Sequence, residues 1–145
     1  MWIDAMAFIP VYSIFLLAVL WAARPSQNIA LWMLVLLAVG VVADQVEGFR
    51  LLALIDAEGG TTAMVGAANR ATIAKELFLA MATGAVGWAL TGLGGWRRHA
   101  GALVVAGAVA VVVAVFAHWP TAPIMLALWL MLALVALIGA IQRRV

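Results

Sequence analysis

The chain has 145 residues, of which 68% are hydrophobic and only 10% are charged, and its mean hydropathy is +1.20. This composition excludes a water-soluble domain and indicates an integral membrane protein. The net charge of +2 comes from a few loop arginines, so nucleic-acid binding is not expected; the lack of cysteine excludes disulfides, thiolate nucleophiles and iron–sulfur ligation.

Five apolar stretches are long enough to cross a bilayer as helices. A hydrocarbon core about 30 Å thick needs roughly 20 residues at about 1.5 Å per residue. The stretches run over residues 5–23, 29–55, 68–93, 100–118 and 121–142. Because the connections between them are short, consecutive helices should be antiparallel neighbours. The sequence therefore predicts an all-α polytopic membrane bundle of five transmembrane helices that forms a single domain over residues 1–145.

The basic residues of the connections fall on one side of the predicted membrane. Arginines follow the first, third and fifth stretches, as Arg24, Arg97, Arg98, Arg143 and Arg144. The opposite side receives Asp4, Asp56, Glu58 and His118. Because lysine and arginine are enriched on the cytoplasmic side, we expect the N-terminus outside and the C-terminus in the cytoplasm.

Six charged residues in or beside the second and third stretches sum to zero charge: Asp44, Glu47, Arg50, Arg70, Lys75 and Glu76. Ionisable groups at membrane depth are costly and usually pair or line a wet cavity, so they mark a candidate site. Counting along the helix puts Asp44 roughly 8 Å inside the outer boundary of the hydrocarbon core. The cluster is therefore predicted in the outer leaflet. Interfacial anchoring is a second interpretation for Arg50 and Arg70, because long basic side chains near helix ends extend to the headgroups.

Helical spacing places the polar residues of both stretches on defined faces. Asp44 and Glu47 share one face of the second stretch. Thr72 and Glu76 belong to a polar stripe on the third stretch, with Lys75 on its flank. Neither face suits contact with lipid, so the two faces are expected to meet.

A hairpin between these two helices would turn near Glu58, and residues equidistant from the turn would then lie level. This register predicts that Asp44 pairs with Lys75 and that Glu47 pairs with Arg70. Asp44 and Glu47 are the candidate general acid or base of the site, and Lys75, Arg70 and Arg50 are candidate anion-binding groups.

Polar residues of the first stretch lie at the same depth. Pro10 cannot donate to the helix ladder and is expected to kink the helix near its outer end, although such a kink can be simple packing geometry. Tyr12 and Ser13 follow it directly. Their depth, which coincides with that of Asp44, makes both residues candidates for ligand binding.

Two further segments leave alternatives open. In the fourth stretch, alanine recurs every fourth residue at Ala102, Ala106, Ala110 and Ala114. Such a ladder permits close helix contact, either with an internal helix or with a second copy of the chain. Residues 56–69, which are rich in Gly, Ala and Thr, are expected to form a loop above the site that serves as a lid or as a simple turn.

No metal or cofactor is expected. His99 and His118 lie at opposite ends of the fourth stretch, so they cannot bind one metal ion or haem together. The glycines at 92–95 mark a helix end and lack the strand and helix of a phosphate-binding loop.

The sequence Asp44-Gln45-Val46-Glu47, followed by Thr72-Ile73-Ala74-Lys75, is similar to a D-x-x-E and T-x-x-K pattern in small bacterial multi-spanning membrane proteins. The resemblance covers two helices, and those proteins tend to have Asn where this chain has Gly48. They carry no established activity. The likeness implies a bacterial inner-membrane location and favours treating Asp44, Glu47 and Lys75 as one unit.

Three functions remain open. The first is a polar pocket in the outer leaflet that binds an amphipathic lipid or isoprenoid-like ligand, either as a binding protein or as an enzyme that acts on this ligand. The second is an accessory subunit of a larger membrane complex, in which the charges give orientation and specificity. The third is a homo-oligomeric ion-coupled transporter, which the shallow depth of the cluster disfavours.

Overall fold

The computed structural model describes residues 9–23 and 27–142, and every regular element among them is an α-helix. The helices are α1 (Ile9–Ala23), α2 (Gln27–Asp56), α3 (Thr62–Thr91), α4 (Gly95–Phe116) and α5 (Ala122–Gln142). The predicted all-α class is confirmed. Arg24, Arg143, Arg144 and Asp4, on which the predicted orientation partly rests, lie outside the described residues.

Four of these helices, α2 to α5, are long and apolar enough to cross a membrane. The described part of α1 is shorter, with 15 residues and a length of about 22 Å. The chain is thus a membrane protein by the length and composition of its helices.

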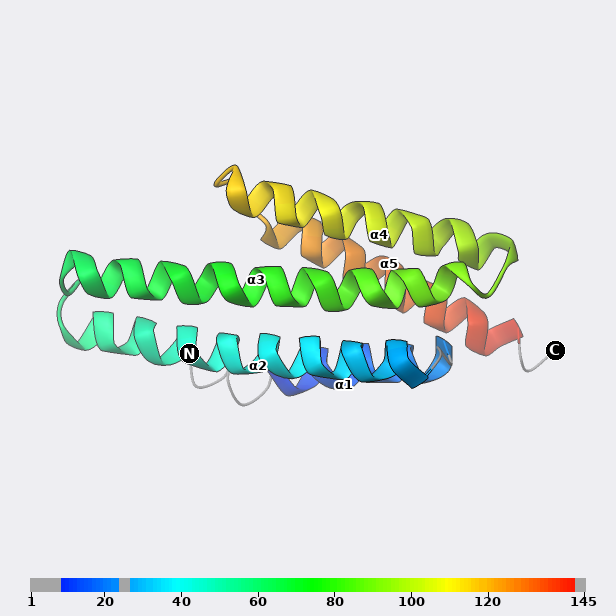
Figure 1. The fold of residues 1–145 in the computed structure, drawn as a ribbon, viewed down its shortest axis with the longest axis horizontal. Helices are drawn as coiled ribbons and strands as arrows, with labels where there is room; N and C mark the ends of the chain where they lie inside the picture. The colour runs from blue at the N-terminus through cyan, green and yellow to red at the C-terminus, as the bar shows by residue number, and fades with distance from the viewer. Residues whose placement is uncertain (1–8, 24–26, 143–145) are drawn as a thin grey trace.

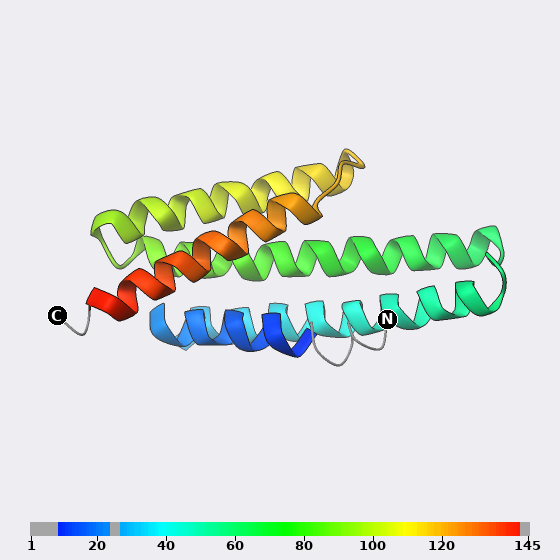
Figure 2. The same cartoon turned by 180° about the vertical axis from the view of Figure 1, so that it is seen from behind.

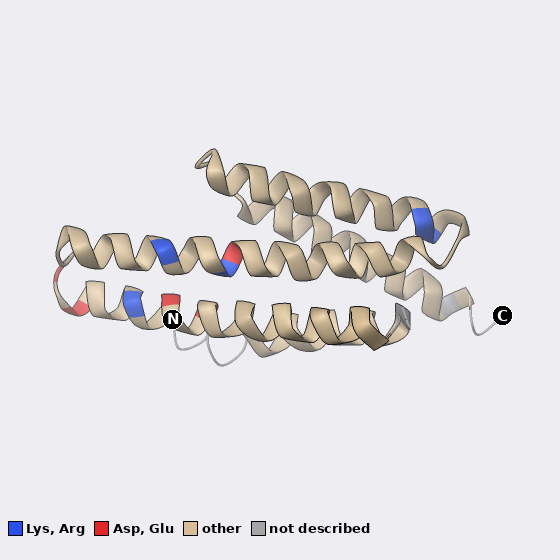
Figure 3. Cartoon of the chain, in the orientation of Figure 1, with Lys and Arg blue, Asp and Glu red and all other residues tan. Residues whose placement is uncertain are grey.

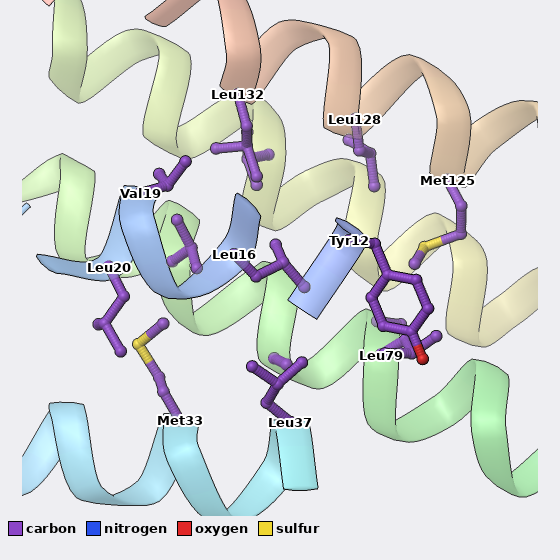
Figure 4. Close-up of a cluster of buried hydrophobic side chains, with 14 of the residues drawn as sticks. Tyr12, Leu16, Val19, Leu20, Met33, Leu37, Leu79, Met125, Leu128 and Leu132 are labelled. Atoms are coloured by element: carbon purple, nitrogen blue, oxygen red, sulfur yellow. The ribbon is translucent and has the colours of Figure 1, made fainter. Parts of the chain in front are cut away.

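Helix α3 occupies the centre of the bundle, with α2 along one side and α4 along the other (Figure 1). Helices α1 and α5 cover the same face of this layer, as the view from behind shows (Figure 2). Side chains of α1 fill the space between the other helices. Four of them, Tyr12, Leu16, Val19 and Leu20, are buried with Met33 and Leu37 of α2 and with Leu128 and Leu132 of α5 (Figure 4).

Helices α2 and α3 form a hairpin that projects beyond the ends of α1, α4 and α5 (Figures 1 and 2). Each has 30 residues and is about 45 Å long, which exceeds a hydrocarbon core of about 30 Å. The turn occupies only residues 57–61, where Gly59 and Gly60 adopt φ values of 102° and 64°. Thr61 then caps α3 by accepting a hydrogen bond from the Met64 amide (3.3 Å).

The predicted loop over 56–69 is therefore wrong in extent, and α3 begins six residues before the predicted 68. The misjudged segment is rich in alanine, which is the strongest helix former, and Thr61 supplies its N-cap. A long lid above the site is absent from this part of the structure, because residues 62–69 are helical.

Helices α3 and α4 come into backbone contact at two glycines, Gly87 and Gly101. A Cβ atom added to Gly101 would lie 2.5 Å from the Gly87 carbonyl oxygen and 2.8 Å from the Thr91 amide nitrogen. The predicted alanine ladder does not make this contact, because Ala102, Ala106 and Ala110 are exposed and only Ala114 is buried. Glycine rather than alanine permits the close packing, since backbone meets backbone there.

Replacing Gly101 by valine should destabilise the protein by about 3 kcal/mol, because the added atoms meet backbone that cannot move aside. Thermal unfolding in nonionic micelles measures the loss. The matched change Ala102→Val, one residue along on the exposed side of α4, should alter stability by less than about 0.5 kcal/mol. Equal losses for both variants would remove the glycine contact from the explanation.

Candidate functional site

An ion-pair cluster joins α2 to α3 near the level where α1 and α5 begin. The Lys75 Nζ atom lies 3.6 Å from Asp44 Oδ1 and contacts Glu47 Oε2 directly. The exposed fraction of the side chain is 16% for Asp44, 11% for Glu47 and 23% for Lys75. The predicted pairing of Asp44 with Lys75 is confirmed, and Lys75 bridges two carboxylates rather than one.

Two hydroxyl groups bind the remaining carboxylate oxygens of this cluster. Tyr12 donates from its phenol to Asp44 Oδ2 (2.9 Å), and Thr72 donates from Oγ1 to Glu47 Oε1 (2.7 Å). The Ala68 carbonyl, 3.2 Å from the same Thr72 oxygen, is a longer alternative acceptor. All four oxygens of Asp44 and Glu47 therefore have a partner, which buried carboxylates require.

Glu76 forms a second polar contact on the same side of α3. The buried Thr121, which directly precedes α5, donates from Oγ1 to Glu76 Oε1 (2.5 Å). No cationic side chain of the described residues lies within ion-pair distance of Glu76. This carboxylate is thus bound by one hydroxyl and makes no ion pair with a described side chain, although the Lys75 ammonium lies near enough to interact with it electrostatically.

An aromatic pair completes the site. The rings of Tyr12 and Trp129 stack with their centroids 5.3 Å apart and their planes 24° from parallel. Trp129 is held from α5 by a hydrogen bond from its indole Nε1 to the buried Thr83 Oγ1 (3.2 Å). The pair links α1 to α5 beside the ion-pair cluster.

Most of these groups, though not Thr72 or Thr83, line a cavity of about 530 Å³ whose walls come from α1, α2, α3 and α5. Its charged lining consists of Asp44, Glu47, Lys75 and Glu76. Its apolar and aromatic lining includes Ile9, Tyr12, Leu51, Leu79, Met125, Leu126 and Trp129. The cavity forms because α2 and α5 each pack on other helices and hardly touch each other.

The two arginines of the predicted cluster stay outside the cavity. Arg50 and Arg70 are exposed on the projecting hairpin, where charged residues gather on both helices (Figure 3). The predicted pair of Glu47 with Arg70 is wrong. Lys75 takes the place of Arg70 because its long side chain reaches Glu47 from the next turn of α3.

Ser13 is not brought to the cavity either. Its hydroxyl oxygen is buried and has no hydrogen-bond partner within the described chain, and the residue does not line the cavity. The predicted kink at Pro10 depends on residues before Ile9, which lie outside the described residues.

Neither Thr121 nor Trp129 was assigned to the site from the sequence. The signal for Thr121 was its place at the start of the fifth apolar stretch, level with the predicted cluster. Trp129 and Thr83 are 46 residues apart in the sequence, and no local pattern connects them. Their hydrogen bond therefore could not be predicted from the sequence.

Within residues 9–23 and 27–142, no group of three or more His, Cys, Asp or Glu side chains is arranged to hold a metal ion. Comparison of the chain with protein-family models, with curated proteins and with solved structures finds no match. The function must therefore be inferred from the chemistry of the cavity itself.

Proposed function

We propose that the protein binds an amphipathic molecule, a lipid or a lipid-like compound, in this cavity at the outer leaflet of a bacterial inner membrane. All five helices then span the bilayer, with the N-terminus outside and the C-terminus in the cytoplasm. The arginines that follow the first, third and fifth apolar stretches fall on one side of the predicted membrane, and they support this orientation. The apolar stretch over residues 5–23, within which α1 lies, is long enough by sequence to cross the bilayer.

The observation that carries the proposal is the joint lining of one cavity by charged and apolar groups. Ligand sites are typically cavities of about 300–1,000 Å³ with mostly apolar walls and a few convergent polar groups. The volume of about 530 Å³ falls in this range, and the charged residues lie together on α2 and α3. A polar head could meet these residues while a tail contacts Leu79, Met125 and Leu126.

Any proton transfer in the cavity would be carried by Asp44 or Glu47, which remain the candidate acid and base. Both carboxylates line the cavity, and they share Lys75 as a counter-ion. A group that exchanges a proton with a bound molecule must reach that molecule, and both carboxylates meet this requirement from the cavity wall.

Filling the cavity without altering any charge tests this function. Gly48 lines the cavity, and a Cβ atom added there would meet no other atom within 4 Å. The variant Gly48→Leu should therefore fold normally and should bind an amphiphile at least about tenfold more weakly, since the leucine occupies the volume of the tail. Native mass spectrometry after gentle extraction measures the retained molecule.

The matched control is Gly66→Leu, which adds the same side chain to α3 in the projecting hairpin. The nearest neighbour of its added Cβ atom is the flexible end of Arg70, at 3.6 Å. Retention should equal that of the unchanged protein. If Gly48→Leu retains as much amphiphile as Gly66→Leu, the cavity is not the binding site.

One structural feature favours a second function, that of an accessory subunit in a larger membrane complex. The projecting hairpin exposes apolar side chains, among them Phe49, Ile55 and Val65. Exposed apolar groups outside the membrane commonly mark a contact with another protein. Under this function, gentle extraction should recover a defined second polypeptide together with the chain; recovery of the chain alone would argue against it.

Ion-coupled transport gains no such support. The polar cluster lies at one end of the bundle, and no lysine, arginine, aspartate or glutamate of the described helices lies between it and Arg97 and Arg98 at the other end (Figure 3). A coupled pathway needs polar groups across the membrane. Ion flux into proteoliposomes that is lost in the Asp44→Asn variant would support ion-coupled transport instead.

A further inference from the structure

The charged lining of the cavity is unbalanced in favour of negative groups. Among the described lining residues, Asp44, Glu47 and Glu76 contribute three carboxylates and Lys75 contributes the only cation, which gives these residues a formal charge of −2. Arg50 and Arg70 do not line the cavity and cannot offset this charge at short range. A phosphate or carboxylate head would therefore be repelled, while a cation would be attracted.

We propose that the head of the bound amphiphile is an ammonium cation that binds beside Glu76, with its alkyl tail along the apolar wall of the cavity. This inference rests on the proposed function, because it names the chemical class of the ligand for the same cavity. A cationic head differs from the anionic head that Arg50 and Arg70 suggested in the sequence analysis.

Glu76 is the carboxylate that an incoming cation would bind, because the other two already have partners. Asp44 and Glu47 are bound by Lys75, Tyr12 and Thr72. Glu76 accepts one hydrogen bond from Thr121 and has no ion pair with any described residue. The Lys75 ammonium is shared by Asp44 and Glu47, and a carboxylate that makes no ion pair of its own is costly at membrane depth, so a cationic ligand offsets that cost.

The aromatic residues of the cavity fit the same class of head. Tyr12 and Trp129 line the cavity together with Glu76. Ammonium groups are attracted to aromatic faces, and the attraction grows where water is excluded. Carboxylate and aromatic groups together therefore favour an ammonium over a neutral head such as an alcohol.

The test compares three probes with the same decyl tail and different heads: decyltrimethylammonium, decanol and decyl phosphate. Each is added below its micellar concentration to the full chain in maltoside micelles, and native mass spectrometry reports the bound fraction. The ammonium probe should bind about tenfold more tightly than decanol, as expected for one charge-assisted contact, and decyl phosphate should bind most weakly.

Glu76→Gln should reduce binding of the ammonium probe about tenfold and leave decanol unchanged, because it removes the charge and keeps the shape. The matched control is Glu58→Gln, which removes a carboxylate from the exposed hairpin turn, outside the cavity. It should bind all three probes as the unchanged protein does.

The outcomes separate this inference from the function on which it rests. Equal binding of all three probes, or preference for decyl phosphate, would overturn the ammonium assignment while leaving the cavity as a binding site. Binding that Gly48→Leu does not weaken would overturn the cavity itself. An amine-bearing lipid retained from the native membrane would identify a lipid source, whereas binding of the added ammonium probe to protein extracted without such a lipid would identify a soluble amphiphile.

Discussion

Replacing Lys75 by methionine should destabilise the protein by about 3 kcal/mol, more than any other single change in the ion-pair cluster. The variant leaves Asp44 and Glu47 without a cation in a largely buried site, and removing one partner of a buried pair typically costs about 3–5 kcal/mol. Asp44→Asn should cost less, about 1–2 kcal/mol, because Lys75 keeps Glu47 as its counter-ion. Unfolding of the protein in micelles by sodium dodecyl sulfate measures both losses.

The control for lost charge on the same helix is Arg70→Met, which should change stability by less than about 0.5 kcal/mol because Arg70 is exposed. A triple variant that also carries Asp44→Asn and Glu47→Gln should recover most of the stability that Lys75→Met loses, since no unpaired charge remains. If Lys75→Met is as stable as Arg70→Met, the ion pairs do not hold α2 to α3.

Replacing Trp129 by alanine should cost about 3 kcal/mol and should also abolish retention of an amphiphile. The indole stacks on Tyr12, donates a hydrogen bond to Thr83 and forms part of the cavity wall. Deleting a large aromatic side chain from a packed site typically costs about 3–5 kcal/mol, and the partial exposure of Trp129 places it at the lower end. Thermal unfolding and native mass spectrometry follow the two effects.

Two milder variants separate the contacts of Trp129. Trp129→Phe keeps an aromatic ring but loses the indole donor, so Thr83 is left without that partner and the cost should be about 1 kcal/mol. Thr83→Val removes the acceptor instead and should cost a similar amount. Full retention of the amphiphile by Trp129→Ala would exclude this side chain from the binding wall.

The core of the ion-pair cluster could be predicted because it depends on local periodicity. Asp44, Glu47, Thr72 and Lys75 lie on facing helices, and a charge at membrane depth has few alternatives to pairing with a nearby opposite charge. The hairpin register is then fixed by the turn to within about one helical turn. That precision was enough to pair Asp44 with Lys75, but it was not enough to assign the partner of Glu47.

The remainder of the site could not be predicted because it depends on tertiary packing. Thr121 directly precedes α5 and Trp129 lies within it, and the sequence does not specify which face of that apolar helix meets α1 and α3. A helix that is apolar on all sides carries no periodic signal for its inner face. The charge balance of the cavity was also misjudged, because it depends on the exposed positions of Arg50 and Arg70.

The unequal packing of the helices bears on the path by which a molecule would reach the cavity. Helix α3 is packed extensively against α2 and α4, with close contact to α4 at Gly87 and Gly101, whereas α1 and α5 have fewer contacts with their neighbours. Regions with few contacts open at lower free energy than densely packed ones. A molecule that enters the cavity from the side would therefore meet the least resistance where α1 or α5 moves outward, and α3 would keep its packing against α2 and α4 during the exchange.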